Sequence, residues 1–275
     1  MDYSQYSLAK TGYLKEDFRL FHINDRTDRE FEWHYHDFHK IIVFVSGKVT
    51  YHIEGKAYQL KPQDILLVSQ GAIHKPEIDP SIPYERYIFW IRDDLSSPEL
   101  NTCFQKANDR SFNLIRLDSV LQEKLKDLLP EIEHSLRDTQ FGDSILSKAL
   151  FAQFMIYINR IFLKSSTAPD QKSYSSDSQV EQLLKYINRN LSENLSIDHL
   201  AERFFFSKYH MMRKFKKETG YTIHNYIISK RLLHARFLIA QGTPVMKAAM
   251  QSGFQDYTAF VRAYKKQFGT VPTQR

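Results

Sequence analysis

Cysteine is almost absent from this chain of 275 residues, which contains only Cys103. A single cysteine can form neither an internal disulfide nor a thiolate metal cage. Stability must therefore come from burial of apolar side chains, and Cys103 is expected to act as a small hydrophobic residue.

Long apolar runs are also missing. The longest, residues 41–45 and 88–91, are far shorter than the ~20 residues that a membrane-spanning helix needs. The first residues lack the pattern of a signal peptide. We therefore expect a cytoplasmic protein without a membrane partner. With 42% hydrophobic and 25% charged residues, the chain has the composition of a globular protein and enough length for two domains.

Acidic residues are scarce in the last third of the chain. Residues 179–275 contain 16 Lys and Arg against 6 Asp and Glu, a net charge of +10, whereas residues 1–178 carry −4. A basic module joined to an acidic one is typical of a phosphate-binding domain fused to a domain with another task. Charge alone is weak evidence, because many basic faces are merely solvated.

Short strands and then helices are predicted before this basic region. Runs of β-branched and aromatic residues separated by turns indicate a small sheet or barrel, with strands at residues 40–46, 48–53, 57–60, 65–68 and 84–91. Helical spacing follows at 119–137 and 143–163, and Pro130 is expected to kink or end the first of these helices. Their apolar stripes suit an internal core or a dimer interface.

The segment 164–178 is rich in small hydroxylated residues and predicts a flexible linker. We therefore predict an α+β multidomain protein. Residues 1–163 form a β-barrel domain with following helices, and residues 179–275 form an all-α domain.

Two stretches of the C-terminal domain share one spacing. The first runs from Ala201 through Phe215-Lys-Lys to Gly220, and the second from Ala249 through Tyr264-Lys-Lys to Gly269. Each has the size of a helix-turn-helix unit, in which a small residue lets two helices cross closely. The sequence thus contains two related units and suggests DNA binding.

Capping residues predict where the helices of these units begin. Ser196 and Ser207 are expected N-caps, and a long helix is expected from Thr222 to about Gln241, where Gly242 stops it. Thr243-Pro244 is expected to open the next helix, and the last clear helix should span residues 256–267.

The second helix of each unit is the predicted reader of the major groove. Met211 and Phe215 should face the core, as should Phe260 and Tyr264. Arginine can contact a guanine edge, whereas lysines at helix ends more often meet phosphate, although a solvated charged face is the alternative for any one of them. The predicted DNA-binding residues are Lys208, Tyr209, Met212, Arg213 and Lys216 in the first unit and Tyr257, Thr258, Val261 and Arg262 in the second.

These motifs resemble a known family. Residues 207–220, SKYHMMRKFKKETG, together with Gly253-Phe254 and residues 264–272, YKKQFGTVP, look like the paired helix-turn-helix domain of AraC/XylS transcription regulators. The resemblance covers residues 180–275 and implies that the two reading helices enter successive turns of the major groove, about 34 Å apart. The resemblance also implies that the helix from Thr222 to Gln241 is the rigid spacer that sets this separation. The chain departs from the family at Phe205, where a small turn residue is common, and at Lys214, where an apolar residue is common. It also stops at Arg275, so that the usual ending of the family is incomplete and the last helix is expected to be frayed or absent.

The N-terminal domain carries a second resemblance. His34-Tyr-His36, Lys40 and Gly47 reproduce the spacing of the first motif of cupin barrels, with lysine in place of the usual glutamate, and residues 71–74 resemble the second motif. Positions 34, 36 and 40 share strand parity, so these side chains should meet His74 inside the barrel. Three imidazoles can hold Zn²⁺ or Fe²⁺, but the ammonium removes a ligand and repels a cation. We therefore expect no metal and no cofactor.

Many sensor domains of this regulator family resemble cupins and bind small effectors rather than catalyse. The resemblance therefore implies a cupin-like sensor whose barrel takes a small molecule, and Lys40 with the histidines would suit a sugar or an anionic metabolite. His39 and His52 have the opposite or an uncertain strand parity, so they are not among the candidate effector-binding residues. The candidate effector-binding residues are His34, His36, Lys40, Tyr51, His74 and Trp90.

The combined interpretation is a one-component transcription regulator and not an enzyme. Its expected partners are promoter DNA, a small-molecule effector, a second copy in a homodimer and, for an activator, RNA polymerase. Effector binding would change dimer geometry or domain contacts. The alternatives are a metal-dependent cupin enzyme fused to a DNA-binding module and an effector-free architectural DNA binder.

Overall fold

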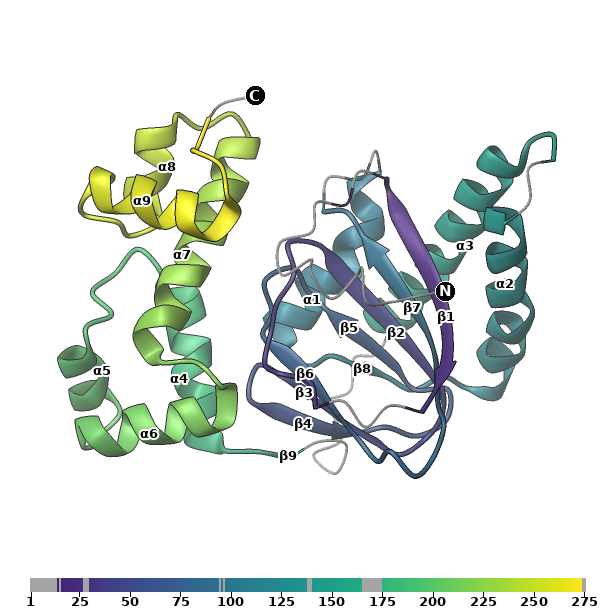
Figure 1. The fold of residues 1–275 in the computed structure, drawn as a ribbon, viewed down its shortest axis with the longest axis horizontal. Coiled ribbons are helices and arrows are strands. Elements are labelled where there is room, and N and C mark those ends of the chain that lie inside the picture. Colours follow the sequence, from purple (N-terminus) through teal and green to yellow (C-terminus); the bar gives the residue numbers. More distant parts are fainter. Residues whose placement is uncertain are drawn as a thin grey trace.

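The fold consists of a β-rich domain followed by an all-helical domain (Figure 1). We describe it from a computed structural model, which places residues 14, 16–26, 30–93, 95, 97–137, 140–164 and 175–273. The order of elements confirms the predicted α+β multidomain class.

Two antiparallel sheets form the barrel of the first domain. Their strand orders are β1-β7-β2-β5-β8 and β6-β3-β4-β9. Each predicted strand is confirmed to within one residue at either end, whereas β1, β6, β8 and β9 were not predicted. The strands are β1 (Phe18–Asp25), β2 (His39–Ser46), β3 (Val49–Ile53), β4 (Lys56–Gln59), β5 (Ile65–Val68), β6 (His74–Ile78), β7 (Tyr84–Ile91), β8 (Leu114–Ile115) and β9 (Ser175–Ser176).

The central strand β2 is buried on both faces. Ile41 and Val43 join the core between the first sheet and the helices, while Ile42 and Phe44 join the core between the two sheets. Side chains alternate across a strand, so a continuous apolar run is what a strand covered on both faces requires.

Helices cover the outer face of the first sheet (Figure 1). They are the short 3₁₀ helix η2 (Pro98–Asn101) and α1 (Thr102–Arg110), α2 (Ser119–Arg137) and α3 (Asp143–Lys164). Both predicted helices are confirmed, but Pro130 lies inside α2, which continues to Arg137. The prediction that the helix could end there was wrong.

Helix α3 packs on the sheet through aromatic rings. Phe151 stacks on Phe18 with ring centroids 4.0 Å apart, and Phe154 stacks on Phe89 at 4.4 Å. By length and composition α3 is also the one helix among the described residues that could cross a membrane. Its buried face instead belongs to the core of this domain, beside the fully buried Cys103.

The C-terminal domain contains six helices in its described residues. They are α4 (Ser178–Arg189), α5 (Ile197–Arg203), α6 (Lys208–Thr219), α7 (Ile223–Ala240), α8 (Val245–Gln251) and α9 (Tyr257–Phe268). Ser196 and Ser207 cap α5 and α6 as predicted, and Thr222 caps α7, which begins where the long helix was expected. Each of the three side chains accepts a hydrogen bond from a first-turn amide. Such caps satisfy amides that have no partner within the helix.

One predicted helix start was wrong. Pro244 itself occupies the N-cap position of α8, which begins at Val245, and Thr243 does not cap it. Pro244 has an extended backbone, with φ of −53° and ψ of 136°, so it precedes the first helical residue instead of occupying the first turn. After α9, residues 270–273 form no helix, and Gln274 and Arg275 lie outside the described residues.

The last residues of the predicted linker form regular structure. Residues 165–174 lie outside the described part of the chain. Ser175 and Ser176 form β9, which pairs with Ala57 and Lys56 of β4, and α4 begins two residues later. The chain thus enters the C-terminal domain from the edge of the second sheet.

Candidate nucleic-acid interface and effector site

Helices α5 and α6 form one helix-turn-helix unit, the first head, and α8 and α9 form the other, the second head. Ala201 in α5 and Ala249 in α8 are both buried. A larger side chain at either place would hold the two helices of its head apart. The repeated alanines therefore position α6 and α9 in equivalent ways.

The predicted reading face of α6 is exposed. Met211 and Phe215 are buried in the core of the first head, as expected. The Arg213 guanidinium lies 5.7 Å from the centre of the Tyr209 ring. Lys208, Tyr209, Met212, Arg213 and Lys216 are all exposed.

Helix α9 repeats this arrangement with one exception. Phe260 and Tyr264 are buried, and Tyr257, Thr258 and Arg262 are exposed as predicted. Val261 is only partly exposed, because it lies at the edge of the buried stripe and packs against the core of the second head. The predicted exposure of Val261 was therefore only partly right.

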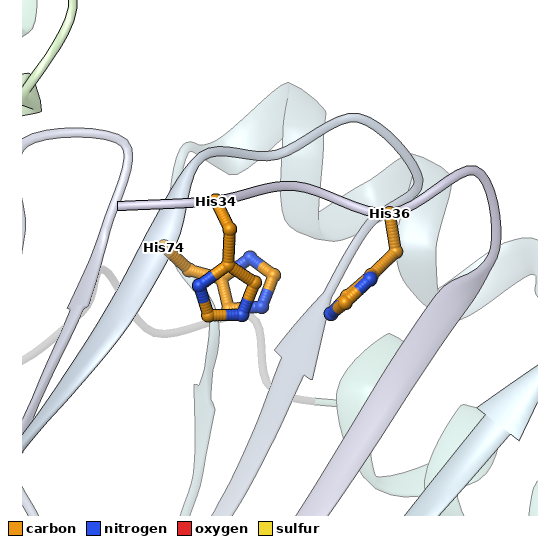
Figure 2. Close-up of side chains that lie close together, drawn as sticks. All are labelled: His34, His36 and His74. Atoms are coloured by element: carbon orange, nitrogen blue, oxygen red, sulfur yellow. The ribbon is translucent and has the colours of Figure 1, made fainter. Parts of the chain in front are cut away.

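Three histidines converge in the N-terminal domain (Figure 2). The rings of His34 and His74 are 4.4 Å apart, those of His34 and His36 are 5.0 Å apart, and those of His36 and His74 are 5.2 Å apart. One nitrogen from each ring lies within 4.8 Å of the others. We call these residues the histidine cluster.

The other three candidate effector residues surround this cluster. The Tyr51 ring lies 6.0 Å from that of His74, and the Trp90 ring lies 6.2 Å from that of His36. Burial and then the nearby positive charge of Lys40 lower the pKa of both His36 and His74 well below the usual range. The structure therefore brings all six candidate residues together.

Hydrogen bonds within the cluster define what it offers a ligand. Nδ1 of His34 bonds to the Glu32 carbonyl and Nδ1 of His74 bonds to the Ala72 carbonyl, each at 2.8 Å. Because a carbonyl only accepts, each Nδ1 carries the proton. Nδ1 of His36 and Nε2 of His74 are buried without a hydrogen-bond partner among the described residues. Nε2 of His74 therefore presents a lone pair, and Nδ1 of His36 a second unused polar atom.

Lys40 adds an amine to this group of acceptors. It has no hydrogen bond or ion pair within the described part of the chain, and burial followed by the charge of Arg86 lowers its pKa to about 8. A metal ion could bind the imidazoles of the cluster, but the amine of Lys40 stands where a carboxylate would complete the set of metal ligands. The residues suit a ligand that carries oxygen atoms better than a bare dication.

A contact between the domains was not predicted from the sequence. Glu54, in the β3–β4 turn, accepts hydrogen bonds from Lys230 Nζ at 2.9 Å and from the Tyr226 hydroxyl, both on α7. Its carboxylate also accepts a hydrogen bond from the Ile73 amide at 2.8 Å. No local pattern in the sequence shows that Glu54 reaches Tyr226, 172 residues later.

Further ion pairs join the domains beside this contact. Asp37 pairs with Arg236 of α7 at 3.0 Å, and Lys56 pairs with Glu181 of α4 at 3.0 Å. A cavity of about 260 Å³ lies between the domains next to the pair of Lys56 and Glu181, and its polar lining includes Lys56, Asn113, Lys185, Asn188, Arg189 and Lys230.

Comparison with known proteins agrees with this architecture. Residues 19–155 match the family described as AraC-like ligand binding domain, and residues 200–275 match the family described as helix-turn-helix domain. A ligand-binding barrel joined to paired helix-turn-helix units defines a DNA-binding transcription regulator. The chain belongs to the AraC family of these regulators, as its motifs predicted.

Similar proteins match along most of the chain. The HTH-type transcriptional activator RhaR of Mannheimia succiniciproducens is 23% identical over 246 residues, which cover 89% of this chain and 86% of RhaR. The uncharacterized HTH-type transcriptional regulator YbfI of Bacillus subtilis is 25% identical over 233 residues, 83% of this chain and 80% of YbfI. The structure of ToxT from Vibrio cholerae aligns with 94% of this chain and 96% of ToxT, at 14% identity and a TM-score of 0.36.

Proposed function

We propose that this regulator reads promoter DNA with the exposed faces of α6 and α9. The observation that carries the proposal is the equivalent exposure of Arg213 and Arg262 on helices built from the same local pattern. Arginine can bond a guanine edge through two N–H groups, which is worth about 1–3 kcal/mol of discrimination. The two heads would then read two neighbouring segments of one operator.

The test compares Arg213→Ala and Arg262→Ala with Lys247→Ala, an exposed residue of α8 outside both reading faces. Each arginine variant should lose specific binding to the operator by about ten-fold or more while keeping most non-specific affinity. Fluorescence anisotropy with operator and scrambled duplexes measures both. Operator affinity equal to that of the parent in both arginine variants would show that these helices are not the readers.

We infer that the histidine cluster, with Lys40, Tyr51 and Trp90, binds the effector. Hydroxyl groups of a ligand can donate hydrogen bonds to the imidazole nitrogens of the cluster that have no partner among the described residues. A carbonyl or carboxylate oxygen of the ligand can accept a hydrogen bond from the Lys40 amine. The aromatic rings of Tyr51 and Trp90 supply apolar walls. A sugar or an anionic hydroxylated metabolite combines these properties.

Thermal shift with neutral sugars, sugar acids and Zn²⁺ tests the site and the ligand class together, because a ligand that binds only the folded form raises its stability. Lys40→Met should abolish the shift given by an anionic ligand, and His52→Asn, outside the cluster, should preserve it. A stoichiometric metal ion that resists chelation would instead favour the metal-dependent enzyme.

We further propose a cytoplasmic homodimer that activates transcription, because the similar protein RhaR is a transcriptional activator. Exposed apolar side chains at the α2–α3 turn and along α3 support a second copy as partner, since large exposed apolar patches mark interfaces. They include Phe141, Ile145, Leu146 and Leu163. Sedimentation of Ile145→Glu tests this contact, and a dimer as stable as that of the parent would place the interface elsewhere. Contact with RNA polymerase would follow for an activator.

A further inference from the structure

Two short segments of the N-terminal domain carry the histidine cluster, and they are bonded to each other. In residues 33–37 and 71–74, the His34 and His74 amides each donate to the other residue's carbonyl, at 3.1 and 2.9 Å. The Gly71 amide donates to the His36 carbonyl at 2.8 Å. Successive side chains of extended backbone point to opposite sides. Each segment therefore has an inner and an outer face.

The outer face of the first segment contacts the DNA-binding domain. Trp33 lies against the end of α6, where a Cβ on Gly220 would come within 2.1 Å of its ring. The Tyr35 ring lies 6.4 Å from that of Tyr221, and Asp37 pairs with Arg236. The odd-numbered residues thus touch the helical domain, while His34 and His36 between them face the cluster.

The second segment repeats this division. Gly71 accepts a hydrogen bond from Lys230 through its carbonyl, at 2.9 Å. Ile73 belongs to the same buried core as α4, α5 and α6. Ala72 lies instead in the core of the barrel and His74 in the cluster. The inner and outer faces are therefore formed by adjacent residues of the same short backbone segments.

We propose that these paired segments transmit occupancy of the histidine cluster to the DNA-binding domain. The proposal rests on the effector site proposed above for its input. A ligand that draws His34, His36 and His74 together must shift the same backbone that holds Trp33, Asp37 and Ile73 against the helical domain. Packed interfaces respond to such shifts by changing between discrete arrangements.

Coupling of this kind is reciprocal, so a change at the outer face must also alter the cluster. The two tryptophans of the chain report on the two faces separately. Trp33 lies on the outer face, whereas the Trp90 ring lies 4.8 Å from that of Phe38 and 6.2 Å from that of His36 on the inner side. The full-length protein labelled with 5-fluorotryptophan should give two ¹⁹F resonances, assigned with Trp33→Phe and Trp90→Phe.

Arg236→Gln removes the outer ion pair without touching the cluster. We expect it to move the resonances of both tryptophans by more than their linewidths. Lys266→Gln, exposed on α9, should move neither. If Arg236→Gln moves Trp33 and leaves Trp90 unchanged, the two faces are independent and the proposal is overturned.

The opposite direction is tested with His36→Ala, after its circular dichroism has been matched to that of the parent. Its affinity for the operator should change by at least about five-fold, the lower end of typical coupling between sites. Unchanged affinity together with an unmoved Trp33 resonance would overturn the proposal. If the parent binds no operator, the proposed DNA function fails, yet the resonances still decide the coupling. If Arg213 proves essential for DNA binding and Trp90 does not respond to Arg236→Gln, only the coupling fails.

Discussion

The two heads have nearly the same local design but different surroundings. Each reading helix ends in a left-handed glycine, Gly220 or Gly269, with φ of 74° and ψ of −8°. The core of the first head includes Ile73 of the N-terminal domain and packs against Trp33 and Tyr35. The core of the second head contains no residue of that domain among the described residues. Sequence repetition therefore produced equivalent heads, and tertiary contact made them different.

On the function proposed above, this difference would give each head a separate task. The barrel fixes the first head directly, through Trp33, Ile73 and the bond of Glu54 to Tyr226, which belongs to the core of that head. It reaches the second head mainly through α7, where Asp37 binds Arg236. A signal from the barrel would therefore act on the first head and on the direction of α7. The second head would follow as the far end of the spacer.

Loss of the Glu54 carboxylate should have the largest effect on the difference between the two heads. In Glu54→Gln, Lys230 loses its ionic partner although its side chain is only 15% exposed. Removing one member of a largely buried pair costs about 3 kcal/mol, so we expect a destabilisation of this size in chemical unfolding. Glu77→Gln, which removes a mostly exposed partner of His52, should change stability by less than about 0.5 kcal/mol. Equal losses in both variants would show that Glu54 does not hold the first head.

A matched pair of glycine substitutions compares the two heads directly. Both Gly220→Ala and Gly269→Ala force a side chain into left-handed backbone, which costs about 1 kcal/mol. Only at Gly220 would the new Cβ also meet Trp33, because nothing lies within 4 Å at Gly269. We expect an additional loss of about 1–2 kcal/mol for Gly220→Ala in the same unfolding assay. Identical losses would mean that Trp33 does not press on the first head in solution.

Hydrogen exchange should distinguish the heads in the unmodified protein. Amides in α6 are protected by a core that includes the barrel, whereas amides in α9 rely on the second head and α7. We expect α9 to exchange about ten-fold faster than α6, which corresponds to about 1.4 kcal/mol. Glu54→Gln should raise the exchange rate of the α6 amides toward that of the α9 amides. Slower exchange in α9 than in α6 would contradict the assignment of the anchored head.

The smallest effect should come from a surface pair within the first head. Lys208 and Asp198 lie 2.6 Å apart, but both side chains are more than half exposed. Asp198→Ala should therefore cost less than about 1 kcal/mol of unfolding free energy. A loss as large as that of Glu54→Gln would show that the first head is held by its own surface rather than by the barrel.

Local patterns in the sequence predicted most of the elements because short-range physics determines them. Ser196, Ser207 and Thr222 each cap a helix by bonding the amide three residues further on, and the apolar run of β2 follows from burial on both faces. Strand β6 was missed because Pro76 interrupts its short sequence, and proline normally argues against a strand. Pro130 was overestimated as a helix breaker, since tertiary packing holds α2 together on both sides of it.

The candidate sites were predictable to different degrees. Strand parity was enough to bring His34 and His36 to one side, and the cupin-like motifs pointed to His74. The contacts of Glu54 with α7 join residues more than 170 positions apart, and one chain gives no local signal for such a pair. Val261 was misjudged because a flank position of an amphipathic helix can turn toward either solvent or core.

The pairing of β9 with β4 also limits how far the domains can separate. Ser176 lies beside Lys56 on the sheet edge, and α4 starts only two residues further on, at Ser178. Release of the Glu54 contact would leave the helical domain tethered at this edge, where a short connection keeps its surface at millimolar effective concentration. Individually weak contacts are then sufficient to close the interface, and small changes in their strength are sufficient to open it.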